Sequence, residues 1–197
     1  TNEDTSSSSS SSTAIYRPRS TRLGDIVNST PAFVKDSLDM SYDKLPSGTP
    51  GQSDYRAFVS LKKARTEGVI FVGANDGMLH AFRDGTYDGD GNTLTPGGTE
   101  VFAYVPNALL PSLNRLADKA YVHRYYVDGP IVESDAYIGG GWKNLVVGTT
   151  GAGAGVMASA GTSPKTAVFA IDATSLNTDV AGLDASSVLW EVHSGMT

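Results

Sequence analysis

The chain has 197 residues, 40% of them hydrophobic and 18% charged, which is the composition of one globular domain or most of one. Its net charge of −6 and its lack of basic runs exclude the electrostatic footprint of a nucleic-acid-binding protein. The absence of cysteine excludes disulfides, thiolate zinc sites and cysteine nucleophiles, and no apolar run reaches the roughly 18–20 residues of a membrane span.

The N-terminal residues 1–15 differ in composition from the rest of the chain. They begin without Met and carry seven consecutive serines, Ser6 to Ser12. Such small polar residues bury too little apolar surface to offset their ordering entropy, so we predict a Ser-rich linker, with a glycosylated stalk as the alternative. The missing Met suggests a mature or excised piece.

From Leu23 onward, short apolar runs alternate with turn residues, and 22 glycines exceed the average share of roughly 7%. These runs predict strands at 25–34, 55–61, 69–73, 78–82 and 100–105, then at 125–138, 144–148, 167–172 and 188–192. A polar stretch rich in Pro and Gly, 35–54, is expected to be an exposed loop. Leucines at helical spacing predict one short amphipathic helix within 106–121.

The two series of strands resemble one repeat. "IVNSTPAFV" matches "IVESDAYI", which places Ser29 opposite Ser134, "VIFVGANDG" matches "NLVVGTTGAG", and "EVFAYV" matches "AVFAID". We therefore predict a mostly β fold, a partial β-propeller with quinoprotein-like blades and the one inserted helix. Two blades cannot close a ring that needs roughly 4–8, so residues 16–197 are expected to be the first blades of a longer protein's propeller.

Residues 68–82, "GVIFVGANDGMLHAF", admit three interpretations: a phosphate loop, a metal site or a hairpin. A phosphate loop needs a Lys after its glycine, and none follows Gly77. The three histidines are far apart in sequence, so His80 is expected to pack its ring and bind backbone with one nitrogen. Asn75-Asp76-Gly77 then predicts a tight turn between two strands.

Other motifs give little support for catalysis. The Gly-rich "GTTGAGAG" at 148–155 lacks the Lys and the spacing of a nucleotide-binding loop, and a flexible hairpin loop is expected there. No G-x-S-x-G elbow occurs. Glu133 and Asp135 are expected on the same face of a strand, which alone is too common to imply acid–base chemistry.

Calcium is the one cofactor that the residues suggest. Asp88, Asp90 and Asn92 alternate as at the start of an EF-hand loop, but Thr93 stands where that loop needs Gly and Thr99 where it needs Glu. We therefore treat Asp88, Asp90 and Asn92 as a weak calcium candidate at the tip of an acidic hairpin.

Several of these segments carry a family resemblance. "RLGDIVNSTP" (22–31), "VGANDGMLHAF" (72–82), "FAYVPNALLPSL" (102–113), "HRYYVDG" (123–129) and "WKNLVVGTTGAGAGV" (142–156) resemble the C-terminal β-propeller of the PilC/PilY family of type IV pilus tip adhesins. The segments occur in the family's order across about residues 16–193. An insertion of small residues before "AVFAID" departs from the family pattern, as does the lack of the family's nine-residue Asp-rich calcium motif.

The resemblance implies a non-enzymatic, extracellular function at the pilus tip. It implies support for pilus assembly, opposition to retraction, and attachment to surfaces or host cells. The implied partners are minor and major pilins, the remaining propeller blades, and a surface or host-cell ligand. Family members also bind calcium, which makes calcium plausible for the whole protein.

Two alternatives to the adhesin function stay open. A quinoprotein-type dehydrogenase shares the blade signature and uses a quinone with calcium, although the adjacent cysteines that many such enzymes carry are impossible here. A generic scaffold, whose unpaired edges recruit the missing blades, is the second.

Overall fold

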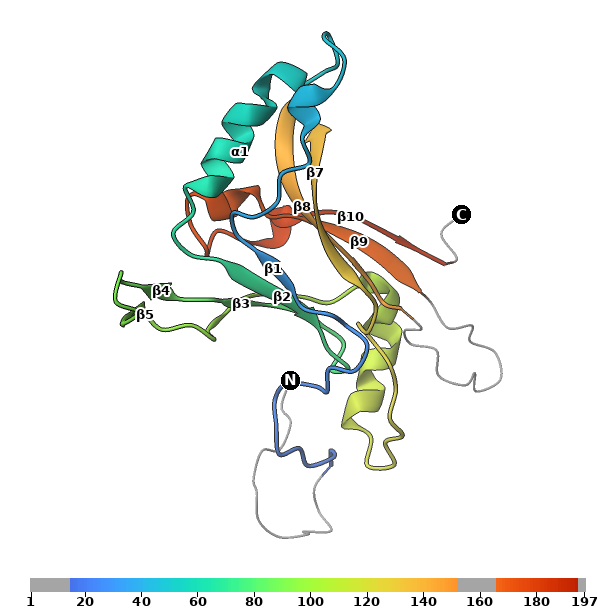
Figure 1. Ribbon diagram of the computed structural model, residues 1–197. Helices are drawn as coiled ribbons and strands as arrows, with labels where there is room; N and C mark the ends of the chain where they lie inside the picture. The colour runs from blue at the N-terminus through green and yellow to red at the C-terminus, as the bar shows by residue number, and fades with distance from the viewer. Residues whose placement is uncertain (1–14, 152–165, 195–197) are drawn as a thin grey trace.

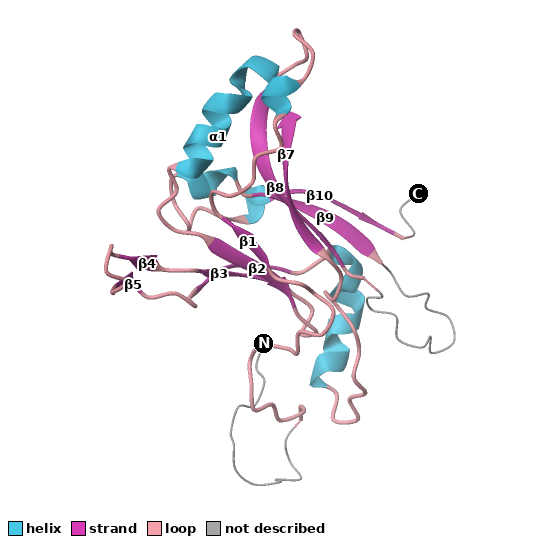
Figure 2. Ribbon diagram, in the orientation of Figure 1, coloured by secondary structure: helices cyan, strands magenta, loops and turns pink. Residues whose placement is uncertain are grey.

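The fold consists of two four-stranded antiparallel sheets that pack face to face (Figures 1 and 2). This computed structural model describes residues 15–151 and 166–194. Most of the predicted linker, 1–14, and part of the Gly-rich loop with the small-residue insertion, 152–165, lie outside the described residues. We call the two sheets blade 1 and blade 2.

Blade 1 has the strand order β1-β2-β3-β6. Its strands are β1 (Ala32–Val34), β2 (Val69–Gly73), β3 (Leu79–Arg83) and β6 (Glu100–Tyr104). A small hairpin, β4 (Thr86–Tyr87) and β5 (Thr93–Thr95), projects from blade 1 between β3 and β6 (Figure 1). The first strand is shorter than the predicted 25–34 because the residues before Ala32 bind neighbouring loops instead of a strand.

Blade 2 has the order β10-β9-β8-β7. Its strands are β7 (Ile131–Ile138), β8 (Gly141–Thr149), β9 (Ala167–Asp172) and β10 (Val188–His193). Short 3₁₀ helices, η4 (Thr174–Asn177) and η5 (Ala185–Ser187), lie between the last two strands. In both blades the first strand in the chain therefore lies at one edge of the sheet and the last strand at the other.

The structure corrects one correspondence of that repeat. β9, "AVFAID", pairs with β8 as β3 pairs with β2, so it matches "LHAFR" rather than "EVFAYV". β6 instead corresponds to β10, the last strand of blade 2. The apolar patterns of β3 and β6 are alike, and only strand pairing distinguishes them.

The match of Ser29 with Ser134 is also wrong. Phe71 pairs with Ala32, and Val146, its counterpart in blade 2, pairs with Glu133. Ala32 of blade 1 is therefore equivalent to Glu133 of blade 2, and three residues earlier Ser29 is equivalent to Pro130. The equivalence of residues in the two blades is therefore set by strand pairing and not by sequence similarity.

The segment 55–61 is a helix and not the predicted strand. α1 (Tyr55–Lys63) buries Tyr55, Phe58, Val59 and Lys62, which recur at helical spacing. Because the last of these four buried residues is a lysine, a count of apolar residues alone does not detect the helical period. Two 3₁₀ turns, η1 (Tyr42–Lys44) and η2 (Gln52–Asp54), precede α1 in the polar stretch predicted as a loop.

The predicted helix within 106–121 exists as 3₁₀ turns, η3 (Asn107–Ala117). It buries Leu109 and Leu116, whereas Leu110 is exposed. Pro111 lies inside it, and a proline without an N–H cannot make the α-helical hydrogen bond.

The main hydrophobic core fills the space between the two blades. Phe71 and Leu79 of blade 1 and Phe169 and Ile171 of blade 2 are completely buried in it. Tyr104 meets Phe169 edge-on with ring centroids 5.1 Å apart. Each such side chain contributes about 1.5–3 kcal/mol on burial, so the face between the blades is the main source of stability.

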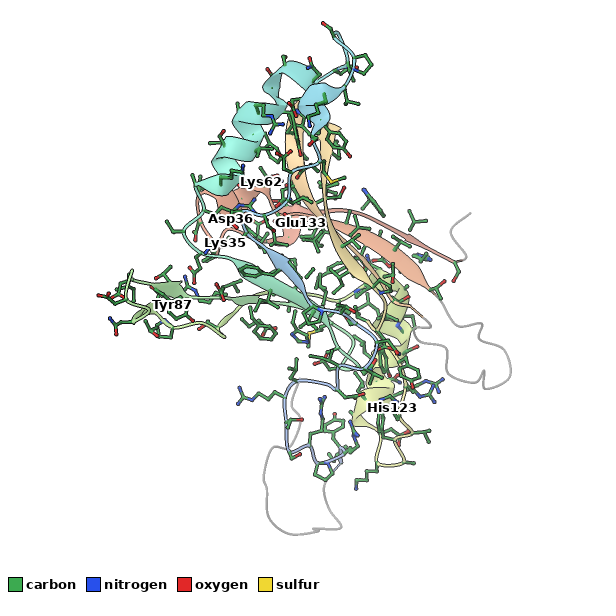
Figure 3. The ribbon with its side chains drawn as sticks, in the orientation of Figure 1. Lys35, Asp36, Lys62, Tyr87, His123 and Glu133 are labelled. Carbon is green, nitrogen blue, oxygen red and sulfur yellow. The ribbon has the colours of Figure 1, made fainter. Side chains whose placement is uncertain are left out.

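A buried ion pair also joins α1 to blade 2. Lys62, labelled in Figure 3, places its Nζ 2.7 Å from both carboxylate oxygens of Asp135, and both side chains are almost fully buried. The Tyr55 hydroxyl donates to Asp135 Oδ2 at 2.7 Å, and Asn144 Nδ2 donates to Oδ1 at 3.2 Å. Burial, and then the hydrogen bond to Asp135, raise the pKa of Tyr55. Asp135 thus has its full set of hydrogen-bond donors without water.

Glu133 lies two residues before Asp135 on the same face of β7, as predicted. Its Oε1 accepts from Asn144 Nδ2 at 2.8 Å, so one amide contacts both carboxylates. Burial raises the pKa of Glu133, opposed by this hydrogen bond and by the charges of Lys62 and Arg65. Arg65 Nη1 donates to Asn144 Oδ1 at 3.0 Å. The pair of carboxylates therefore belongs to the joint between α1 and blade 2.

We expect Lys62→Met to lower the free energy of unfolding by about 3–5 kcal/mol, because it leaves the buried charge of Asp135 unpaired. The matched control is Lys63→Met on the exposed side of α1, with an expected change within about 0.5 kcal/mol. Adding Asp135→Asn to Lys62→Met should recover part of the loss. Urea unfolding measures all three variants, and equal stability of Lys62→Met and Lys63→Met would show that the ion pair is unimportant.

Candidate functional site: a polar pocket at the loop end of the blades

The turn between β2 and β3 forms as predicted. Gly77 has φ of 98°, in the left-handed region that suits glycine, and its N–H donates to the Ala74 carbonyl at 3.3 Å. A Cβ at Gly77 would lie 2.5 Å from Leu113 Cδ2 of η3. Asn75 and Asp76 are nevertheless buried, at 2% and 6% exposure, which a hairpin tip on the surface would not be. Their side chains are therefore available to bind other loops.

Asn75 contacts two segments that are distant in sequence. Its N–H donates to the Asp25 carbonyl at 3.0 Å, and its Nδ2 donates to Asp25 Oδ2 at 3.1 Å. Its Oδ1 accepts from the Tyr126 N–H at 2.9 Å. One side chain thus joins the segment before β1 to the segment before β7.

Asp76 binds the same N-terminal segment and His80. Its Oδ2 accepts from the Gly24 N–H at 2.8 Å, and both its oxygens lie 3.1 Å from His80 Nε2. His80 Nδ1 lies 2.5 Å from Glu100 Oε1 on β6. The expected backbone partner for His80 is therefore wrong: two carboxylates hold the imidazole, which also stacks on Phe82.

The pKa values of His80 and Asp76 are shifted in opposite directions. Burial acts to lower the pKa of His80, but the hydrogen bonds and charges of Asp76 and Glu100 outweigh it and raise the pKa. Burial acts to raise the pKa of Asp76, but its bonds to His80 and to the Gly24 N–H lower it overall. Both shifts favour an ion pair between His80 and Asp76.

A second set of bonds ties the segment before β1 to the segment before β7. Asp128 is buried and accepts from both the N–H and the Nδ2 of Asn28, at 3.0 and 2.5 Å. Ser29 Oγ accepts from the Gly73 N–H at 2.9 Å. We call the polar residues Asp25, Asn28, Asn75, Asp76, His80 and Asp128 the loop-end cluster.

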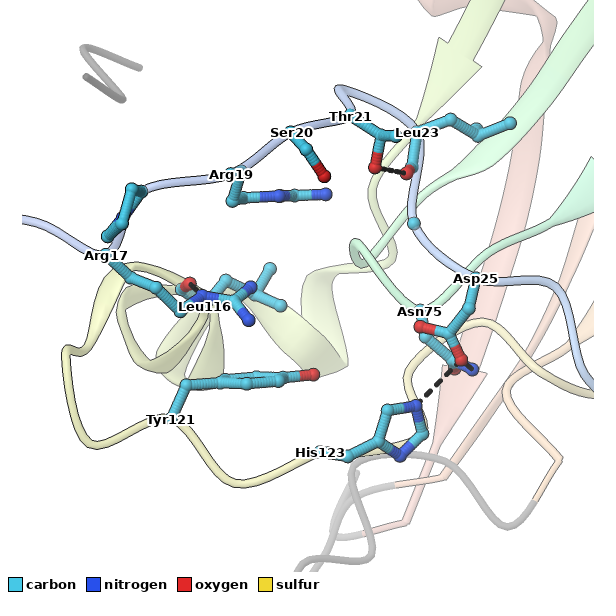
Figure 4. A pocket seen from close by; sticks show the side chains of 12 residues that line it. Arg17, Arg19, Ser20, Thr21, Leu23, Asp25, Asn75, Leu116, Tyr121 and His123 are labelled. Carbon is cyan, nitrogen blue, oxygen red and sulfur yellow. Dashed lines mark hydrogen bonds and ion pairs between the residues drawn. The ribbon is translucent and has the colours of Figure 1, made fainter. Parts of the chain in front are cut away.

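An open pocket of about 350 Å³ lies beside the loop-end cluster, between residues 17–25 and the end of η3 (Figure 4). Arg17 and Tyr121 form one wall, with the Arg17 guanidinium carbon 3.8 Å from the centroid of the Tyr121 ring. Asp25 and His123 form the opposite wall, and His123 Nε2 lies 2.7 Å from Asp25 Oδ2. The pocket is the candidate site because it combines a fixed cation, a carboxylate and hydroxyl groups.

Burial acts to raise the pKa of Asp25, but the hydrogen bonds from Asn75 and His123 outweigh it and lower the pKa. Asp25 is therefore a carboxylate at neutral pH. It presents to the pocket an acceptor whose charge is partly offset by its neighbours.

The calcium candidate lies elsewhere, on the projecting hairpin whose Tyr87 is labelled in Figure 3. Asp88 Oδ1 accepts from the N–H groups of Asp90 and Asn92, and Asn92 Nδ2 donates to Asp88 Oδ2 at 2.9 Å. Asn92 thus turns its NH₂ group to Asp88, whereas a calcium ion would need its oxygen. The donor set as arranged does not fit calcium, and a site there stays a prediction.

Across residues 15–151 and 166–194, no group of three or more His, Cys, Asp or Glu side chains is placed to hold a metal ion. No helix in this described part is long and apolar enough to cross a membrane. Reasoning from spacing missed Arg17, Asp25, Tyr121 and His123 as pocket residues, since they are far apart in sequence. The available signal was that Asp25, Asn75 and His123 each lie in a segment that carries the family resemblance.

Comparison with known proteins identifies the family. A family model described as the PilY1 beta-propeller domain matches residues 23–195. The chain belongs to the PilY1 beta-propeller domain family. This confirms the resemblance to the PilC/PilY family and the predicted mostly β, partial-propeller fold class. The matched range includes the segments that form the loop-end cluster.

Similar proteins carry names from type IV pili. A "Type IV pilus biogenesis factor PilY1 homolog" of Xylella fastidiosa strain Temecula1 is 41% identical over 185 residues, 92% of this chain and 11% of that protein. The "Type IV pilus biogenesis factor PilY1" of Pseudomonas aeruginosa strain PAK is 39% identical over 141 residues, 70% of this chain and 11% of that protein. The chain thus spans about a tenth of the length of these relatives.

A solved structure was also matched. The crystal structure of the Pseudomonas aeruginosa PilY1 C-terminal domain is 31% identical, with a TM-score of 0.48, and the match covers 82% of this chain and 25% of that one.

We expect His80→Gln to lower stability most in mild acid. The raised pKa of His80 means that its bonds to Asp76 and Glu100 stabilise the fold fully below the unfolded value near pH 6.5 and are lost as pH rises through the folded pKa. Because the pKa of Asp76 is lowered, the stability that its ionised carboxylate contributes is lost only as pH falls below about 4. Charge-assisted bonds of this kind contribute about 1.5–3 kcal/mol.

Unfolding free energies at pH 5, 7 and 9 test this expectation. The difference between the original protein and His80→Gln should shrink towards pH 9. The control is His193→Gln, a partly exposed histidine whose ring contacts the Ser194 carbonyl at 3.2 Å. A pH-independent difference for His80→Gln would contradict an ionised His80.

Proposed function

We propose that this chain is part of a non-enzymatic type IV pilus biogenesis factor, located at the pilus tip outside the cell. In this proposal the protein supports pilus assembly, opposes retraction and mediates attachment to surfaces or host cells. The observation that carries the proposal is the family match over residues 23–195, together with relatives that are named as pilus biogenesis factors.

The arrangement of the motif residues supports the proposal. The segments 22–31, 72–82 and 123–129 meet in the loop-end cluster and around the pocket. Their side chains position loops, and they do not form the nucleophile–base pairs of an enzyme that uses covalent catalysis. No specific observation favours the quinoprotein dehydrogenase, and the names of the relatives favour the biogenesis factor.

We propose the remaining propeller blades as partners, besides minor and major pilins and the surface ligand. The face of blade 2 that points away from blade 1 carries Val132, Val168, Trp190 and Val192, which are 40–57% exposed. Apolar side chains gathered on one face of a sheet favour coverage by another sheet. A third blade would bury them as blade 1 buries the opposite face.

Deletion of the encoding gene in the bacterium that carries it tests the function. We expect loss of surface pili, of twitching motility and of attachment, with recovery when the gene is restored. Deleting the retraction motor as well should restore pili but not attachment, because opposition to retraction is then unnecessary. Normal pili and attachment in the single deletion would reject the proposal, and pili that stay absent in the double deletion would reject the part that concerns retraction.

We also propose weak calcium binding by Asp88, Asp90 and Asn92, which requires the hairpin tip to rearrange. Calorimetry with millimolar calcium should give saturable heat that Asp88→Asn with Asp90→Asn removes. Asp118→Asn is the matched control, because the Asp118 carboxylate also accepts a local backbone N–H, that of Ala120. Absence of heat, or equal heat in the Asp88 and Asp90 variant, would remove calcium from this hairpin.

A further inference from the structure

We propose that the pocket between Arg17 and Asp25 binds the carboxylate-bearing ring of an acidic saccharide. The choice of a saccharide rests on the proposed attachment function, whereas the preference for a carboxylate rests on the pocket alone. The argument starts from Arg17, the cation that the structure holds most rigidly at this site.

Arg17 is fixed before any ligand arrives. Its N–H donates to the Ala117 carbonyl at 2.9 Å, and its Nε donates to the Leu116 carbonyl at 3.2 Å. The guanidinium also stacks over Tyr121. No hydrogen bond from its two Nη atoms to another described residue occurs, and Figure 4 shows this guanidinium at the pocket between Arg19 and Tyr121. A planar pair of N–H donors, on a side chain already positioned by its Nε bond and by the Tyr121 ring, suits a carboxylate.

The opposite wall offers a hydrogen-bond acceptor. His123 and Asn75 both bind Asp25 at Oδ2, and among the described residues no other residue donates to Oδ1. Ser20 contributes an exposed hydroxyl to the rim. One cation, one acceptor and neighbouring hydroxyls match a ligand that carries an acid group and hydroxyl groups on one ring. A simple alkyl carboxylate has no hydroxyl groups, so it would bond Arg17 without donating to Asp25.

Charge and size agree with this ligand. The chain as a whole has a net charge of −6, yet two arginines, Arg17 and Arg19, line this pocket. The bonds from His123 and Asn75 offset part of the Asp25 charge at the same place. The volume of about 350 Å³ lies at the small end of the roughly 300–1,000 Å³ of ligand pockets, which suits one sugar residue.

The test compares methyl glucuronide with methyl glucoside, which has the same ring without the carboxylate. Both are titrated into the purified full-length protein that contains this chain and followed by saturation-transfer NMR. We expect saturable millimolar binding of the glucuronide and at least tenfold weaker binding of the glucoside. Equal binding of the two sugars would overturn the carboxylate assignment.

Variants locate the binding. Arg17→Gln should weaken glucuronide binding at least tenfold, and Ser20→Leu should do so by filling the pocket without removing a described bond of Arg17. The matched control is Arg56→Gln, an exposed arginine of α1 paired with Asp39 and Asp43, which should bind as before. Unchanged binding in Ser20→Leu, or an equal loss in Arg56→Gln, would overturn the proposal even if Arg17→Gln unfolds.

A third titration separates the saccharide from other carboxylates. Glutarate carries the acid group without the hydroxylated ring and should bind at least tenfold more weakly than the glucuronide, whereas equal binding would overturn the saccharide part. Cells carrying Ser20→Leu should keep normal pili but attach less to a glucuronate-coated surface. Normal attachment by those cells would overturn the inference, whereas failure of the pilus proposal would show only in the gene deletion.

Discussion

The side chain of Asn75 determines how the two blades meet at their loop end. It is almost fully buried, and its amide satisfies both Asp25 and the N–H of Tyr126. A buried amide without partners would cost about 1–3 kcal/mol. The fold is therefore destabilised unless the segments of Asp25 and Tyr126 stay in contact with Asn75. Bonds from Gly24 to Asp76 and from Gly73 to Ser29 also join the segment before β1 to the β2–β3 hairpin.

The buried ion pair of Lys62 and Asp135 has a different consequence. Two charges removed from water gain little net stability, but a different packing of α1 would leave one of them unpaired. The pair therefore favours one position of α1 on blade 2 over the alternatives that a purely apolar contact would allow. The Tyr55 ring, whose hydroxyl bonds Asp135, also packs against Trp142 of blade 2, with centroids 4.6 Å apart.

The charged and polar groups of the pocket come from loops that are distant in sequence. Arg17 and Tyr121 come from the segment before β1 and from the segment after η3, and neither is near the other in sequence. Arg17 is held by the carbonyls of Leu116 and Ala117 and by the Tyr121 ring, so contacts within the protein position this wall. Such an arrangement lowers the ordering cost of binding a ligand.

The sequence alone determined the β content, the turn at Asn75 to Gly77 and the family, because apolar runs, turn residues and motif order are local properties. It did not determine that 55–63 is helical, since a buried Lys62 occupies one position of the apolar face, nor which strand of blade 2 matches β6. Only the tertiary structure decided that Asp25, Asn75 and His123 meet and that Arg17 faces them. The physical reason is that such contacts join residues far apart in sequence, and only the packing of both blades brings them together.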